Sequence, residues 1–182
     1  RDILQVNYRA LAALNDALVD RVADGGTIVA IASRAGWRWA ENLEQVKAFM
    51  ALPGSQLLPD FIARHAIDPV RAYDLSKEAV IAWTKAATGR LKTLGLRANT
   101  VSPAAIETRI LGDFMTAFGD RAERGVALMG RPGTAAEAAE VAAFLARPAS
   151  DWVQGVDVAV DGGLTAQLEA EAEAAAIAGR AR

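Results

Sequence analysis

Three short apolar runs, each separated from the next by a segment long enough for a helix, most strongly constrain how this 182-residue chain folds. They are Thr27 to Ala32, Leu96 to Ser102 (the second stopped by Pro103) and Val156 to Val160, and they are rich in β-branched residues. Such runs are typical of strands buried on both faces. Strands that alternate with helices predict a parallel sheet. We therefore expect an α/β fold with a doubly wound parallel sheet, of which three strands lie in this chain.

Helical segments are predicted between these runs. Residues 2–23 and 72–93 carry apolar side chains at helical spacing. Thr134 and Glu137 have the spacing of a capping box, which predicts a third helix that runs to about Arg147. Four residues of the 72–93 helix are expected to contact the core: Val80, Ile81, Trp83 and Leu91.

Three further segments have weaker patterns. Residues 37–70 contain two tryptophans and three prolines and are expected to form an inserted, mostly helical segment. Residues 104–130 predict an irregular stretch with short helical pieces. From Glu169 the Ala- and Glu-rich tail predicts either a frayed helix or disorder, and we assign it no function. The domain is thus expected to occupy residues 1–168, and the tail residues 169–182.

The composition excludes several function classes. The net charge is −2 with scattered basic residues, so no nucleic-acid partner is expected. The absence of cysteine excludes disulfides and thiolate metal sites and fits a reducing, cytoplasmic location. No apolar run approaches the roughly 20 residues of a membrane span, and no signal peptide is visible. The single histidine, His65, has no companion ligands, so we expect it at the surface and expect no metal site.

The strongest chemical signal is a tyrosine and a lysine four residues apart, Tyr73 and Lys77, on one face of the 72–93 helix. An ammonium near a phenol lowers the pKa of that phenol, and such a pair can move a proton on or off a substrate oxygen. An isolated pair of this kind is more often an ordinary tyrosine beside a solvated lysine. Ser33, however, ends the first strand, and residues 103–108 follow the second, so both reach the sheet edge where ligands bind.

At this point the chain resembles the short-chain dehydrogenase/reductase family. Ser33 at a strand end, the Tyr-x-x-x-Lys helix, the N-x-V-x-P strand at 99–103 and the V-D-G-G at 160–163 stand in the family's order. Asn7 matches the family's helix asparagine. The resemblance covers residues 2–164 and implies a Rossmann-like fold, an NAD or NADP cofactor with NAD slightly favoured, and hydride transfer between an alcohol and its ketone or aldehyde.

The resemblance also implies a role for each matching residue. Tyr73 is the general acid/base, and Ser33 orients the same substrate oxygen. Lys77 lowers the pKa of Tyr73 and holds the nicotinamide ribose, while Asn7 supports a water that links Lys77 to solvent. The cofactor contacts are expected from Tyr73, Lys77, Pro103, Ala104, Ile106 and Thr108, the last two at the nicotinamide carboxamide.

Within the family, the long segment between Ser33 and Tyr73 and the stretches 76–84, 107–114 and 130–133 resemble the group of 3α-hydroxysteroid and coniferyl-alcohol dehydrogenases. The resemblance implies a small alcohol or carbonyl substrate and a homo-oligomer, either dimer or tetramer. Trp37, Trp39 and Phe114 are expected either to line an aromatic pocket or to pack in the core. No arginine cluster is apparent in the substrate region, so we expect an aromatic or polycyclic alcohol rather than a hydroxy acid.

The chain departs from the family pattern in two ways. Ala104 stands where the family has glycine, and it is strained if that position needs a positive φ. The sequence also lacks the family's Gly-rich turn after a first strand, which implies that the chain is the C-terminal part of the domain, with roughly 75–80 residues before Arg1 judged from the usual size of βαβ units. Two alternatives therefore stay open: a catalytically incompetent fragment and a non-catalytic association module.

Overall fold

The computed structural model describes residues 1–180 and contains the expected parallel sheet. Strands β1 (Thr27–Ile31), β2 (Arg97–Pro103) and β5 (Asp157–Val160) lie in the order β1-β2-β5, and both strand pairs are parallel. Nearly every residue of β2 is buried because it is the central strand. The predicted α/β fold and its three strands are confirmed.

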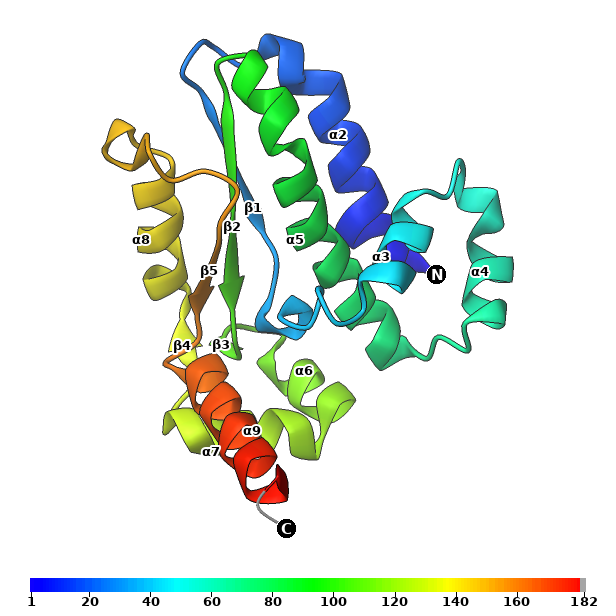
Figure 1. Ribbon diagram of the computed structural model, residues 1–182, viewed down its shortest axis with the longest axis vertical. Coiled ribbons are helices and arrows are strands. Elements are labelled where there is room, and N and C mark those ends of the chain that lie inside the picture. Colours follow the sequence, from blue (N-terminus) through cyan, green and yellow to red (C-terminus); the bar gives the residue numbers. More distant parts are fainter. Residues whose placement is uncertain (181–182) are drawn as a thin grey trace.

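Helices cover both faces of this sheet (Figure 1). Helix α5 (Pro69–Thr93) packs on one face, with α2 (Leu11–Leu18) beside it, and α8 (Ala135–Leu145) packs on the other. Helices α6, α7 and α9 gather at the carboxyl ends of the strands. The sheet is therefore doubly wound, as predicted, and its carboxyl edge is enclosed by helical segments.

The first predicted helix is present as one helical stretch from residue 2 to residue 21. It consists of α1 (Asp2–Leu4), a π-helical turn (Gln5–Ala10), α2 and a closing 3₁₀ turn (Val19–Arg21). A π-helical turn widens the helix locally and often occurs at functional sites. Here it contains Asn7, one of the predicted site residues.

Helix α5 begins three residues before the predicted start. The Asp68 side chain accepts a hydrogen bond from the backbone N–H of Arg71 at 2.7 Å, and Pro69 stands in the first turn, where a missing N–H costs nothing. Of the four expected core residues, Val80, Ile81 and Leu91 are buried, while Trp83 is half-buried against the core. This long helix is what carries Tyr73 and Lys77 to the sheet edge.

The segment 37–70 is mostly helical, as expected. It contains α3 (Leu43–Met50), a 3₁₀ turn (Ser55–Leu57) and α4 (Leu58–Arg64). Its buried phenylalanines join the core around α5. His65 is exposed, with its ring 4.4 Å from that of Phe61, which confirms the surface position.

The short helical pieces expected within residues 104–130 are present, and the stretch is more regular than predicted. Two helices, α6 (Leu111–Phe118) and α7 (Asp120–Met129), meet at Gly119, whose φ is +48°. Strands β3 (Ile106–Glu107) and β4 (Gly133–Thr134) form a small parallel pair. The Thr134–Glu137 capping box is present and α8 follows it directly, ending at Leu145. Ala104 is not among the residues with positive φ, so its side chain introduces no backbone strain.

The tail continues a regular helix. Helix α9 (Leu164–Arg180) begins before the expected tail boundary and runs through it, so the helical alternative holds over the described residues. It packs beside α7, and Arg124 of α7 pairs with Glu171 of α9 at 2.6 Å. Among residues 1–180 we find no helix with the length and apolarity required to cross a bilayer.

Candidate active site

Two of the predicted catalytic side chains meet at the carboxyl edge of the sheet. Ser33 follows β1, and its hydroxyl accepts a hydrogen bond from the backbone N–H of Ala35 at 3.2 Å, which starts a 3₁₀ turn (Arg34–Gly36). The same hydroxyl donates a long, 3.5 Å hydrogen bond to the carbonyl oxygen of Pro103 at the end of β2. Ser33 also lies close enough to the phenol of Tyr73 to oppose the rise in the pKa of that phenol that burial causes.

Two phenylalanines of α6 pack against the Tyr73 ring. The ring of Phe118 stands edge-on to it at 5.3 Å between centroids, and that of Phe114 at 6.4 Å. Burial outweighs the opposing effect of Ser33, so the pKa of Tyr73 is raised above its ordinary value. The sequence did not point to Phe118, although it lies one helical turn beyond Phe114, whose place in an aromatic pocket was expected.

Lys77 lies close to Tyr73 but points elsewhere. Its ammonium nitrogen is 5.9 Å from the centre of the Tyr73 ring and donates a hydrogen bond to the carbonyl oxygen of Ile31 at 3.1 Å. Burial lowers the pKa of Lys77. Desolvation of the phenol dominates its pKa in this arrangement, and the lowering of the Tyr73 pKa by Lys77 stays a prediction.

Asn7 reaches the same helix one residue before Lys77. Its side-chain amide donates a hydrogen bond to the Ser76 hydroxyl at 3.1 Å, and that hydroxyl donates to the carbonyl oxygen of Tyr73 at 2.7 Å. The π-helical turn is thus tied to the backbone between Tyr73 and Lys77. The water relay assigned to Asn7 stays a prediction.

The remaining predicted cofactor residues lie at the end of β2 and just after it: Pro103, Ala104, Ile106 and Thr108. Ala104 and Ile106 border a cavity of about 160 Å³ between the ends of β2 and β5, which Asp161 and Gly162 also line. Thr108 is exposed, and its hydroxyl donates a 3.5 Å hydrogen bond to the carbonyl oxygen of Ile106. Pro103 closes β2 beside Ser33.

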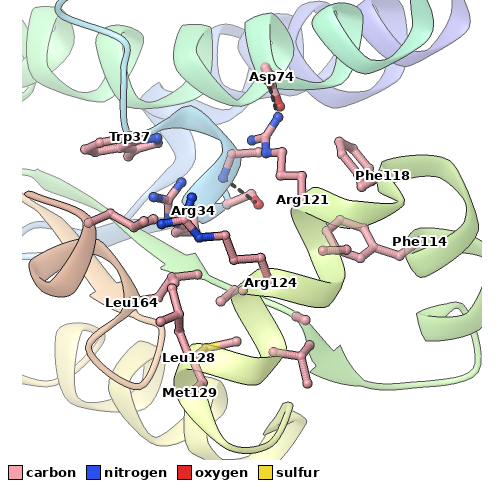
Figure 2. Close-up of a pocket in the computed structure, with 18 of the residues that line it drawn as sticks. Arg34, Trp37, Asp74, Phe114, Phe118, Arg121, Arg124, Leu128, Met129 and Leu164 are labelled. Carbon is pink, nitrogen blue, oxygen red and sulfur yellow. Dashed lines mark hydrogen bonds and ion pairs between the residues drawn. The ribbon is translucent and has the colours of Figure 1, made fainter. Parts of the chain in front are cut away.

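A larger cavity of about 550 Å³ opens beside Ser33 (Figure 2). Its apolar wall comes from α6, α7 and the start of α9, and includes Phe114, Phe118, Leu128, Met129 and Leu164. Trp37 lines it too, whereas Trp39 lines a separate cavity, where the ammonium of Lys85 stands 5.4 Å from its ring. The aromatic pocket predicted for Trp37 and Phe114 is present without Trp39.

Arginines from distant parts of the chain also gather at this cavity, which corrects the expectation that no such cluster exists. Arg34, Arg121 and Arg124 all line it. Arg121 pairs with Asp74 of α5 at 2.7 Å. Burial raises the pKa of Asp74, and the ion pair with Arg121 opposes that rise.

Gly36 allows the 3₁₀ turn after Ser33 to touch the backbone of α5. A β-carbon at this position would stand 2.7 Å from the carbonyl carbon of Lys77 and 2.9 Å from the nitrogen of Glu78. Both contacts are with backbone, which cannot rotate away. Only glycine therefore lets the loop that holds Ser33 pack this closely on the helix that holds Tyr73.

Gly36→Ala is accordingly expected to destabilise the fold by about 1–3 kcal/mol, the usual cost of overpacking. Urea unfolding measures this difference. Gly89→Ala is the matched control: Gly89 also lies in α5 but has nothing within 4 Å of an added β-carbon. In mid-helix that change should stabilise by about 0.5–1 kcal/mol. Equal effects of the two substitutions would contradict the close approach.

The two tyrosines of the chain should titrate late in the native protein. Burial raises the pKa of Tyr8 to about 12, and also raises that of Tyr73. Because the folded pKa exceeds the unfolded value of about 10, the stabilisation linked to Tyr8, about 2–3 kcal/mol, is complete below pH 10 and is lost as the pH rises towards 12. Tyrosinate absorbance should thus stay low at pH 10 in the native protein and reach half its maximum there in urea. Equal curves would contradict the burial of both phenols.

Comparisons with known proteins agree with this geometry. Residues 42–165 match a family model described as enoyl-(acyl carrier protein) reductase. The chain is 31% identical over 164 residues to coniferyl-alcohol dehydrogenase of Pseudomonas sp. strain HR199. The match covers 89% of this chain and 64% of that protein. The chain is also 30% identical over 173 residues to 3-alpha-hydroxysteroid dehydrogenase/carbonyl reductase of Comamonas testosteroni. That match covers 92% of this chain and 67% of the relative.

Among solved structures, the 3-alpha-hydroxysteroid dehydrogenase of Pseudomonas sp. B-0831, complexed with NADH, superimposes with a TM-score of 0.80 at 31% identity. The match covers 92% of this chain and 67% of that one. The chain thus spans about two thirds of the length of these relatives. The sequence match, the shared fold and the order of the site residues together place the chain in the short-chain dehydrogenase/reductase family.

Proposed function

We propose that the protein containing this chain is an NAD- or NADP-dependent oxidoreductase that interconverts an alcohol and its ketone or aldehyde. The observation that carries this proposal is the meeting of Ser33 and Tyr73 at the carboxyl edge of the sheet, beside a cavity of about 550 Å³. Ligands of open α/β sheets bind at this edge. The similarity to dehydrogenases supports the same reaction.

The residues at this edge fit a nicotinamide cofactor. Ala104 and Ile106 border the smaller cavity, and the Thr108 hydroxyl beside it offers both a donor and an acceptor, as a carboxamide requires. Tyr73, Lys77 and Pro103 complete the proposed set, with the Lys77 ammonium available to a ribose hydroxyl. A nicotinamide held by these residues would supply the hydride acceptor for the alcohol carbon, or the hydride donor for the carbonyl carbon. A structure with NADH bound to a relative supports NAD as the cofactor.

In this proposal Tyr73 is the general acid/base, which donates a proton to the substrate oxygen or accepts one from it. Because burial raises its pKa, the phenol is protonated at neutral pH and can donate a proton to the carbonyl oxygen during reduction. Oxidation requires the phenolate, which the ammonium of Lys77, 5.9 Å from the ring centre, stabilises electrostatically. Ser33 donates a hydrogen bond to the same substrate oxygen and orients it.

The substrate proposed for this site has an aromatic or alicyclic body, as in coniferyl alcohol or a 3α-hydroxysteroid. The support is the cavity wall formed by Trp37, Phe114, Phe118 and the neighbouring leucines. An apolar wall of this kind favours a substrate that leaves water together with its own apolar surface.

The test is formation of reduced cofactor by the complete gene product, measured by absorbance with NAD or NADP and either coniferyl alcohol or a 3α-hydroxysteroid. We expect turnover that depends on both cofactor and alcohol. A folded protein that reduces neither cofactor would contradict the proposal and favour an association module.

We further propose a homo-oligomer, either dimer or tetramer. Its support is the family resemblance together with large apolar side chains that are exposed in one chain, above all Trp152 at 98%. Light scattering on a sizing column tests it, and a monomer at micromolar concentration would contradict it.

A further inference from the structure

Arg34 is a buried cation at the wall of the larger cavity that forms no ion pair with any described residue. Its residue is 9% exposed, and its Nε is buried without a hydrogen-bond partner among the described residues. None of the ion pairs formed within residues 1–180 includes it. A buried charge without a partner is costly, so its retention requires an explanation.

The other arginines of the cavity are already paired. Arg121 pairs with Asp74, Arg124 with Glu171, and Arg38 with Glu41. Burial lowers the pKa of Arg34, and the charge of Arg121 lowers it further. The carboxylates of Asp161, Asp74 and Glu169 oppose this shift, but none of them forms an ion pair with Arg34. Arg34 therefore has carboxylates in its neighbourhood but no direct ion-pair partner, and a bound anion would supply one.

The position of Arg34 links this charge to the chemistry. It follows Ser33 directly, and its guanidinium carbon lies 4.4 Å from the centre of the Trp37 ring. Figure 2 shows it at the middle of the cavity, between Trp37 and the arginines of α7. Packing on the ring restricts the guanidinium, and a carboxylate is the group that arginine binds with paired hydrogen bonds.

We propose that Arg34 binds a carboxylate of the substrate, so that the site takes an alcohol or carbonyl compound with an aromatic or alicyclic body and an acidic group. The alcohol or carbonyl group of this substrate rests on the proposed function. The contact between its carboxylate and Arg34 does not. The apolar wall receives the body, Ser33 and Tyr73 hold the reacting oxygen, and Arg34 selects the charged members of the class.

The test measures binding rather than turnover, so its failure is separate from that of the proposed reaction. Isothermal titration calorimetry compares 3-phenylpropionate with its neutral amide, 3-phenylpropanamide, on the complete gene product. We expect the carboxylate to bind about tenfold or more tightly, as charge-assisted hydrogen bonds predict. Arg34→Met should bring the two affinities within about twofold. Arg38→Met, which removes a paired arginine from the same cavity, should preserve the preference.

Several outcomes would overturn the proposal. Equal affinities in the unsubstituted protein, or binding of neither compound, would mean that Arg34 only packs on Trp37. A preference that survives Arg34→Met would assign the anion to another residue. NADH titrations on the same variants test whether the anion that Arg34 binds is instead a phosphate of the cofactor. A tenfold loss of NADH affinity with an unchanged carboxylate preference would assign Arg34 to that phosphate. If circular dichroism shows that Arg34→Met does not fold, Arg34→Gln replaces it. The ratio of the carboxylate and amide affinities in the unsubstituted protein still tests the proposal.

Discussion

Replacing Tyr73 by phenylalanine is expected to lower kcat by about 10²–10⁴-fold, because the substrate oxygen loses the group that exchanges a proton with it. The ring itself is retained, so its edge-on packing against Phe118 at 5.3 Å should survive and the fold should be unchanged. Steady-state kinetics with coniferyl alcohol and NAD measure the effect. KM should change much less than kcat, since the hydroxyl acts mainly in the transition state.

Tyr8→Phe is the matched control for this prediction. Tyr8 is the other tyrosine of the chain and is 5% exposed, with its ring 5.2 Å from that of Phe49. It lies in the core rather than at the sheet edge, so loss of its hydroxyl should leave kcat within about twofold of the unsubstituted value, as expected for a group outside the reacting geometry. Near-normal kcat in a folded Tyr73→Phe variant would contradict the acid/base role.

Prediction from sequence succeeded where one local signal dominates. The strands β1, β2 and β5 are short β-branched runs bounded by glycine, proline or a charged turn, and no helix fits between those boundaries. The capping box at Thr134 is equally local, since its two hydrogen bonds join residues three apart.

It failed where the outcome depends on contacts between distant segments. Helices α6 and α7 are only 8 and 10 residues long and are separated by a glycine, so neither has the length to stand out from an irregular stretch. They persist because they pack against each other and because α7 also packs against α9. The start of α5 was missed for a different reason: Pro69 resembles a helix breaker until its place in the first turn is known.

The candidate site divides in the same way. Ser33 and Tyr73 could be found because each lies in a local motif, and strand order carries both to one edge. Phe118 and Arg121 could not, because their approach depends on how α6 and α7 pack at this edge of the sheet. The direction of the Lys77 side chain was also beyond the sequence. A lysine four residues from a tyrosine can reach either the phenol or a strand carbonyl, and here it reaches Ile31.

An ion pair on α5 is expected to matter most for stability. The side chain of Glu78 is 1% exposed, and both its oxygens accept hydrogen bonds from Arg71, at 2.9 and 2.6 Å. Asn42 donates a third at 2.7 Å, and Arg71 also binds the Gln45 side chain. These contacts fasten the start of α3 to the helix that carries Tyr73.

Arg71→Met should therefore destabilise the protein by about 3–5 kcal/mol, because it leaves the Glu78 carboxylate buried with only Asn42 as a partner. Glu78→Gln should cost less, about 1–3 kcal/mol, since Arg71 is 24% exposed and its freed guanidinium can reach water. Arg90→Met removes an ion pair to Asp16 in which both side chains are more than half exposed, and should cost at most about 1 kcal/mol. Urea unfolding of the three variants gives this order. If Arg71→Met costs no more than Arg90→Met, then Glu78 does not depend on Arg71 for its buried charge, and the attachment of α3 to α5 must come from the apolar contacts of Val46 and Phe49 instead.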